Sequence, residues 1–190
     1  MVLSHAAKIP CTTTITREYI VCLEQRQRHD ASVNDISVFT DGSCDQPAGI
    51  GGWAAIVLAD GGKVLLSGRA YETTHQRMEL TAAVEAIRYI KGLEYDGRRI
   101  FLYTDSQYLA DLPRRKNRLL GDGLKTRRNR PIANADLLLQ LFQFLDSHLL
   151  ELIKVQSHQK KNGLVNYNRE VDKCSRKVVR DTVRNGPDKG

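Results

Sequence analysis

Two short apolar segments of this chain end in the same way, and they restrict the fold more than any other feature. Residues 36–40 and 99–104 are rich in β-branched and aromatic side chains, which predicts strands, and each is followed at once by an aspartate. If these strands are parallel neighbours, Asp41 and Asp105 leave the sheet at one edge and share one crevice. The rest of the chain is expected to support that crevice or to hold what enters it.

The segment after the first strand contains Gly49, Gly51 and Gly52. No Gly-Lys-Ser/Thr follows and the next apolar run is a strand, so a tight turn over 41–52 is favoured over a phosphate-binding loop. Residues 53–59 and 63–71 then predict a hairpin around an Asp-Gly-Gly turn. The first three strands should therefore form an antiparallel meander.

The remainder of the chain alternates helical and strand patterns. The expected helices cover 73–91 (capped by Thr73 or Thr74), a short stretch through Leu112 that Pro113 breaks, 134–147 and 169–183, and a last strand covers 149–156. Helices that link parallel strands, after a meander, indicate an α/β fold. We expect a mixed five-stranded sheet, three antiparallel strands followed by two parallel ones, flanked by helices.

The length of 190 residues predicts one domain, 36–183, with two extensions. Residues 1–35 carry four basic and four acidic side chains and are expected to be partly disordered or a short helix, and 184–190 are expected to be a disordered tail. No apolar run is long enough for a membrane span, and the start lacks a secretory pattern. Four scattered cysteines without a CxxC pair indicate reduced thiols. A cytoplasmic protein is expected.

The formal charge of +7 is concentrated in one segment. Residues 113–130 contain eight basic side chains against the single acid Asp122. Such a segment predicts an anionic partner such as nucleic acid, although a merely solvated charge run is the alternative.

Four acidic residues are expected to converge: Asp41 and Asp105 at strand ends, and Glu79 and Asp172 early in two helices. Taken singly, each fits a solvated carboxylate or a helix cap. Together they repel one another, which raises the pKa of at least one unless cations are present. Oxygen ligands suit Mg²⁺ or Mn²⁺, and two such ions can promote in-line hydrolysis of a phosphodiester.

Four motifs in this order resemble the type 1 ribonuclease H family: Phe39-Thr-Asp-Gly-Ser-Cys44, Thr73-Thr-His-Gln-Arg-Met-Glu-Leu-Thr-Ala-Ala83, Tyr103-Thr-Asp-Ser-Gln-Tyr108, and His158 with Asn168-Arg-Glu-Val-Asp172. The resemblance covers about 36–182. It implies the ribonuclease H-like fold and endonucleolytic hydrolysis of the RNA strand of RNA/DNA hybrids, leaving 5′-phosphate and 3′-hydroxyl ends. It also implies two Mg²⁺ ions, for which Mn²⁺ could substitute.

By matching positions, the resemblance makes Asp41, Glu79, Asp105 and Asp172 the metal ligands. His158 would assist proton transfer or product release, and a plain surface histidine is its alternative. The positions that would contact the hybrid are Gly42, Ser43 and Cys44 at the ribose, Thr74 at a DNA phosphate, Gln76, Gln107 and Asn134, and, in the basic segment that resembles the family's handle, Arg114, Arg115, Lys116, Lys125 and Arg127.

The chain also departs from the family pattern. Gln46-Pro47-Ala48 stands where many relatives have Gly-Asn-Pro, and His75-Gln76 stands where Asn-Asn is usual. The basic segment lacks the tryptophans common in bacterial relatives, which leaves Leu119, Leu120 and Leu124 to pack it.

The leading hypothesis is therefore a metal-dependent ribonuclease H, monomeric because no exposed apolar stretch demands a partner. A non-catalytic module that binds hybrid or double-stranded RNA is one alternative, and another nuclease of the same fold is the second.

Overall fold

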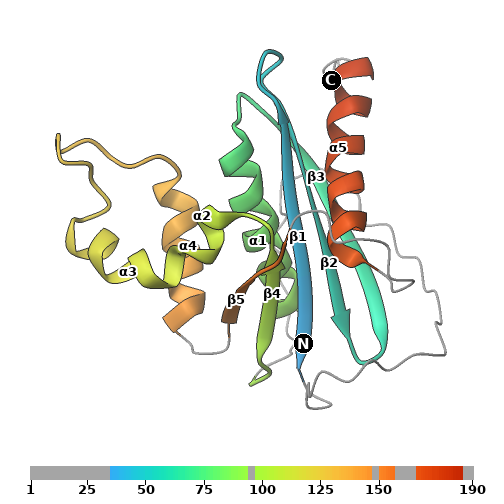
Figure 1. Cartoon of the computed structure of the whole chain (residues 1–190), viewed down its shortest axis with the longest axis horizontal. Helices are drawn as coiled ribbons and strands as arrows, with labels where there is room; N and C mark the ends of the chain where they lie inside the picture. Colours follow the sequence, from blue (N-terminus) through green and yellow to red (C-terminus); the bar gives the residue numbers. More distant parts are fainter. Residues whose placement is uncertain (1–34, 94–96, 147–149, 157–165, 186–190) are drawn as a thin grey trace, which may run out of the picture.

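The computed structural model describes residues 35–93, 97–146, 150–156 and 166–185, and its centre is a five-stranded sheet (Figure 1). The strands are β1 (Ile36–Asp45), β2 (Ile50–Ala59), β3 (Gly62–Tyr71), β4 (Ile100–Thr104) and β5 (Leu150–Lys154). Their order across the sheet is β3-β2-β1-β4-β5. The first three strands pair antiparallel, whereas β4 pairs parallel to β1 and β5 parallel to β4. The predicted mixed sheet is confirmed.

Helices cover both faces of this sheet. The helices are α1 (His75–Lys91), α2 (Gln107–Ala110), α3 (Leu112–Gly121), α4 (Ala135–Asp146) and α5 (Tyr167–Asn185). One apolar cluster joins Ile36 and Val38 to buried residues of α1 to α4, and a second, on the other face, joins Ile56 to Val171 of α5. Alternate residues of β1 face opposite ways, so Phe39 and Asp41 lie on the α5 face.

Strand β1 is longer than the sequence predicted. It continues past Thr40 to Asp45 and is paired with β2 from Ser37 to Asp45, so Asp41 lies in the middle of a strand and Gly42 to Cys44 are strand residues, not a turn. The turn is confined to 46–49, where Gly49 has a φ of 65°. The prediction of a turn over 41–52 was wrong because Gly51 and Gly52 complete the ladder with Cys44 and Ser43.

The glycines of this ladder let both helices approach the sheet. A Cβ on Gly51 would lie closer than 3.0 Å to the side chains of Thr73 and Met78, and one on Gly52 would lie 2.6 Å from the carbonyl oxygen of Ser175. Glycine is therefore needed at these two positions so that the helices can pack against the sheet, and not to bind a phosphate or to make a turn.

The ends of two helices also differ from the prediction. Pro113 does not end the helical region, because it lies in the first turn of α3, where its missing N–H has no intrahelical partner to lose. Helix α5 includes Arg184 and Asn185, which the sequence had placed in a tail. Residues 1–34 and 186–190 lie outside the described residues. Within the described part, no helix is both long and apolar enough to span a membrane.

Gly42 tests how closely α1 must approach β1. An added Cβ would lie closer than 3.0 Å to backbone atoms of Met78 and Glu79, which cannot move independently of the helix. We expect Gly42→Ala to lower the free energy of unfolding by about 2 kcal/mol or more, measured by urea denaturation. Gly121→Ala is the control, since its Cβ meets nothing within 4 Å and stability should stay the same or rise. Equal stability of the two variants would contradict the packing argument.

Candidate active site

A cavity of about 190 Å³ lies at the edge of the sheet where β4 ends. All four acids singled out from the sequence line it, together with four further residues. The lining consists of Asp41, Gly42, Ser43, His75, Glu79, Asp105, Asp172 and Arg176. Two strands and two helices that are distant in sequence thus contribute one carboxylate each to a single small space.

The register of the parallel strands brings the two aspartates together. Thr40 pairs with Thr104, so Asp41 and Asp105 follow at equivalent positions. Strand β4 ends there, whereas β1 continues for five residues. This leaves a step in the sheet that is open to both faces. Asp172 of α5 reaches the step from one face and Glu79 of α1 from the other.

Each of three carboxylates has its own polar partner. The Ser175 hydroxyl donates to Asp41, and the Ser106 hydroxyl donates to Glu79 at 2.5 Å. Arg176 pairs with Asp172 at 2.8 Å. Ser106 is also the N-cap of α2, so the turn that ends β4 orients Glu79 directly. Neither role was predicted from the sequence, because the residues around a serine do not indicate which distant carboxylate its hydroxyl contacts.

The environment of Asp41 opposes its charge. Burial, helped by the negative charges of Asp105 and Asp172, raises the pKa of Asp41 to about 6, although the hydrogen bond from Ser175 works in the opposite direction. The sequence predicted that at least one acid of the cluster has a raised pKa, and Asp41 is that acid.

Four carboxylates supply the hard oxygen donors that Mg²⁺ and Mn²⁺ prefer. In the present arrangement, no group of three or more His, Cys, Asp or Glu side chains among the described residues is close enough to hold a metal ion. Three of the carboxylates, those of Asp41, Glu79 and Asp172, instead contact Ser175, Ser106 and Arg176. The donor set fits a divalent cation by type and charge, and binding one requires the side chains to exchange these partners.

His75 is an unexpected member of the cavity. Its Nδ1 lies 3.4 Å from Oε1 of Glu79, one helical turn away. The hydrogen bond with Glu79 raises the pKa of His75, and the charges of Glu79, Asp41 and Asp105 act in the same direction. From the sequence, His75 was only a departure from the usual asparagine. Its spacing of four residues from Glu79 on a helix was the signal that could have placed it in the site.

Two of the residues expected to contact the hybrid, Thr74 and Asn134, lie around Arg77. The Thr74 hydroxyl is the N-cap of α1 and accepts from the Arg77 backbone N–H at 3.2 Å, which leaves its own proton to donate. The Arg77 guanidinium donates to Asn134 at 3.1 Å and pairs with Asp136 at 2.7 Å. Gln76 follows His75 in the first turn of α1, and Gln107 is the first residue of α2. These four expected contacts thus flank the cavity without lining it.

The basic segment forms α3 and the loop to α4, which project from the sheet (Figure 1). Arg114, Lys125 and Arg127 are exposed, whereas Arg115 lies over the ring of Tyr108. Lys116 is paired with Asp146, its side chain only 13% exposed, and so ties α3 to α4. Leu119 and Leu124 are buried as expected, but Leu120 is 40% exposed. His158 lies outside the described residues.

Comparison of the sequence with known proteins places the chain in a family. Residues 33–180 match the family model for RNase H. The ribonuclease H of Moorella thermoacetica is 36% identical over 128 residues, 66% of this chain and 82% of its own. That of Nitrosococcus oceani is 35% identical over 159 residues, 81% of this chain and 97% of its own.

Solved structures agree in fold. The structure of LC9-RNase H1, a type 1 RNase H with the type 2 active-site motif, superposes with a TM-score of 0.64 at 24% identity and covers 80% of this chain and 75% of that protein. LC11-RNase H1, solved in complex with RNA/DNA hybrid, gives a TM-score of 0.55 at 13% identity and covers 78% and 99%. The architecture is thus that of the type 1 ribonucleases H. The chain belongs to the ribonuclease H family, a family of enzymes.

Because the pKa of Asp41 is raised, replacing its carboxyl group by a neutral one should increase the free energy of unfolding at any pH where the carboxylate is charged. Between about pH 4 and 6 the folded protein holds a proton on Asp41 that the unfolded chain has lost, so the free energy of unfolding falls as pH rises through this range. In EDTA, Asp41→Asn should therefore stabilise the protein at pH 7.5, by at most about 3 kcal/mol, and not at pH 4. Chemical denaturation at both pH values measures this.

Asp181→Asn is the matched control, because Asp181 is exposed on α5 outside the cavity. It should leave the stability nearly unchanged at either pH. A gain from Asp41→Asn that is equal at pH 4 and 7.5 would rule out the electrostatic explanation.

Proposed function

We propose that this ribonuclease H is an endonuclease that hydrolyses the RNA strand of RNA/DNA hybrids. The observation that carries the proposal is the cavity into which β1, α1, α5 and the end of β4 each send one carboxylate. Family membership supports activity on hybrids, and the related LC11-RNase H1 was solved with such a hybrid. Cleavage would leave 5′-phosphate and 3′-hydroxyl ends. A monomer in the cytoplasm belongs to the same proposal.

The arrangement of polar groups supports different contact sites for the RNA strand and the DNA strand of the hybrid. Backbone groups of Gly42 and Ser43 border the cavity, where a ribose 2′-hydroxyl could distinguish RNA from DNA. Thr74, with its free hydroxyl proton, and Asn134, in the loop that follows α3, both contact Arg77 and would contact a phosphate of the DNA strand. The exposed Arg114, Lys125 and Arg127 extend this surface.

Asp41, Glu79, Asp105 and Asp172 would hold two divalent cations, with Mg²⁺ preferred and Mn²⁺ as a substitute. When bound, these ions supply an activated water and charge stabilisation for the leaving oxygen. The protein's own residues position the reaction: Ser106 and Ser175 orient two of the carboxylates, and His75 donates to Glu79. His158 is assigned proton transfer or product release on the family resemblance alone.

Cleavage of labelled duplexes in Mg²⁺ tests the enzyme assignment. The wild-type protein should cut the RNA of an RNA/DNA hybrid and leave DNA/DNA and RNA/RNA duplexes intact. Asp105→Asn should slow cleavage about 100-fold or more, because it removes a charged donor from the cavity. Asp181→Asn, the same substitution on the exposed face of α5, should cut at the wild-type rate.

Two results would contradict this function. An uncut hybrid with tight binding would indicate a non-catalytic hybrid-binding module. Preferred cutting of another duplex would indicate a different nuclease of the same fold.

The handle, defined as α3 and the loop that follows it, should contribute salt-dependent binding. Lys125 and Arg127 are exposed, so each can neutralise one phosphate. The double variant Lys125→Ala/Arg127→Ala should lower the slope of log affinity against log salt by about 2. Fluorescence anisotropy with labelled hybrid in EDTA measures the slope without cleavage. An unchanged slope would show that these two charges are only solvated.

A further inference from the structure

Helix α5 carries a row of basic side chains that the proposed function does not use. With 3.6 residues per turn, six of them fall within a stripe about 100° wide. They are Arg169, Lys173, Arg176, Lys177, Arg180 and Arg184, and all are exposed. The acids Glu170, Asp172 and Asp181 lie outside the stripe. A helix exposed only to solvent has no need to gather cations in this way, because like charges on neighbouring turns repel.

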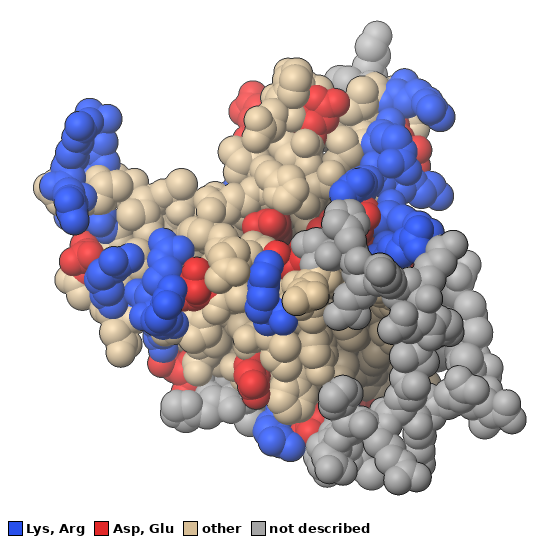
Figure 2. Space-filling model, viewed as in Figure 1, with Lys and Arg blue, Asp and Glu red and all other residues tan. Residues whose placement is uncertain are grey.

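This α5 stripe is separate from the handle. In Figure 2, Lys and Arg side chains gather over α3 and its loop on the left and over α5 on the right, with acidic side chains between them. The two basic surfaces therefore flank the acidic cavity on opposite sides. Only the handle was apparent from the sequence, because the cations of α5 are interspersed with acids along the chain and separate from them only around the helix.

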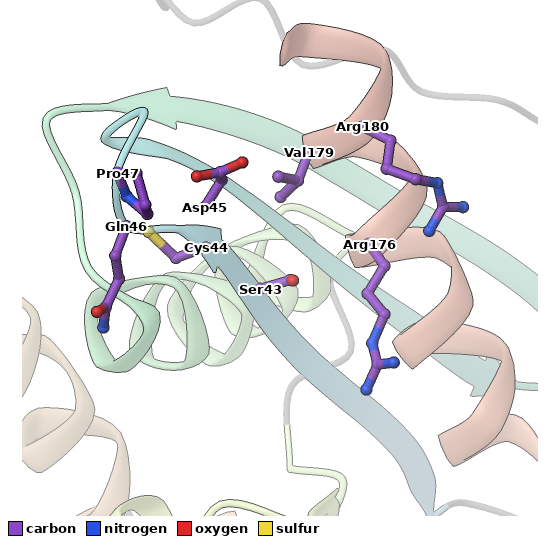
Figure 3. Close-up of a pocket in the computed structure, with 8 residues that line it drawn as sticks. All are labelled: Ser43, Cys44, Asp45, Gln46, Pro47, Arg176, Val179 and Arg180. Carbon is purple, nitrogen blue, oxygen red and sulfur yellow. The ribbon is translucent and has the colours of Figure 1, made fainter. Parts of the chain in front are cut away.

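A second cavity connects the α5 stripe to the acidic cavity of the candidate active site. It has a volume of about 530 Å³ and lies between the β1–β2 turn and α5 (Figure 3). Arg176, Val179 and Arg180 line it from α5, and residues 43–47 from the strand and turn. Ser43 and Arg176 line both cavities, so the two are contiguous.

The second cavity is lined by two guanidinium groups, those of Arg176 and Arg180, and by one carboxylate, that of Asp45 (Figure 3), so the charge of its lining favours an anion. Arg176 is paired with Asp172, but Arg180 and Arg184 form no ion pair with another described residue. Four residues of helix advance about 6 Å, so Arg176, Arg180 and Arg184 follow one another at intervals of about 6 Å. Phosphates of one strand advance about 3.4 Å along a duplex axis, so each step spans about two nucleotides.

We infer that the α5 stripe binds the backbone of the RNA strand on one side of the cleaved bond. This rests on the proposed function, which places a phosphate of the RNA strand in the acidic cavity. A strand held there continues into the contiguous second cavity, past Arg176 to Arg180 and Arg184. The DNA strand is assigned to the opposite side, at Thr74, Asn134 and the handle. The RNA strand is therefore the one within reach of α5.

Binding of a labelled hybrid in EDTA, followed by fluorescence anisotropy, tests the inference. Arg180→Ala/Arg184→Ala should weaken binding about 10-fold at moderate salt and reduce the salt slope by about 2. The control is Arg88→Ala/Lys91→Ala, which removes the same charge from the far end of α1, about 20 Å along the helix from His75. The control should keep the wild-type slope. Equal slopes for both double variants would overturn the inference.

Hybrids with uncharged methylphosphonate linkages in one strand identify the strand that is bound. The wild-type protein should lose affinity when either strand is neutralised. Arg180→Ala/Arg184→Ala should become less sensitive to neutralisation of the RNA strand and keep its sensitivity to the DNA strand. The opposite pattern would overturn the assignment to RNA.

Cleavage of the unmodified hybrid by the wild-type protein in Mg²⁺ is measured in parallel. If the wild-type protein fails to cleave, the proposed function is lost, whereas the slope comparison still decides whether α5 binds the duplex. If it cleaves and the α5 variant binds hybrid as tightly as wild type does, only the α5 inference is lost. The substituted side chains are exposed, so thermal unfolding should confirm that every variant is folded.

Discussion

The unequal length of two paired strands determines the rest of this structure. Strand β1 pairs with β4 only as far as Thr40 and Thr104, but it stays paired with β2 as far as Asp45. Continued pairing with β2 fixes the backbone of Asp41, and the end of β4 opens the space beside it. A longer β4 would fill this space, and a shorter β1 would leave Asp41 on a loop. Side chains from both faces of the sheet can meet only because the two ends differ.

The four carboxylates of the cavity repel one another, and this repulsion has two effects in the structure. Hydroxyl groups of Ser175 and Ser106 and the guanidinium of Arg176 hold three carboxylates in place. The unfavourable free energy that these contacts do not offset raises the pKa of Asp41. Such a site stores unfavourable charge that a cation relieves, so affinity for the cation and stability of the folded protein are linked. Under the proposed function, lower stability in the absence of cations would be part of how the site favours them.

The sequence predicted the features that depend on local patterns. Strand and helix identities, the parallel pairing of the two Asp-bearing strands and the meeting of four acids all follow from periodicity and topology rules. It did not predict where β1 ends, because Gly51 and Gly52 resemble turn residues unless the partner helices are known. It also missed His75, Ser106, Ser175 and the α5 stripe. The two serines act on carboxylates far away in sequence, which a linear pattern does not contain, whereas His75 and the α5 stripe become apparent only when residues are placed around a helix.

The glycines of the β1–β2 ladder have a consequence for how this protein responds to mutation. Gly51 and Gly52 contribute no functional group, yet their bare backbones bring α1 and α5 close enough to place two of the four acids. A mutational scan that scores activity alone would rank them beside the acids. Abundance measured in the same scan would separate the two groups, because only the glycines are needed to build the domain. A position can therefore be intolerant to substitution because a helix packs closely against its backbone, and not only because its side chain takes part in the reaction.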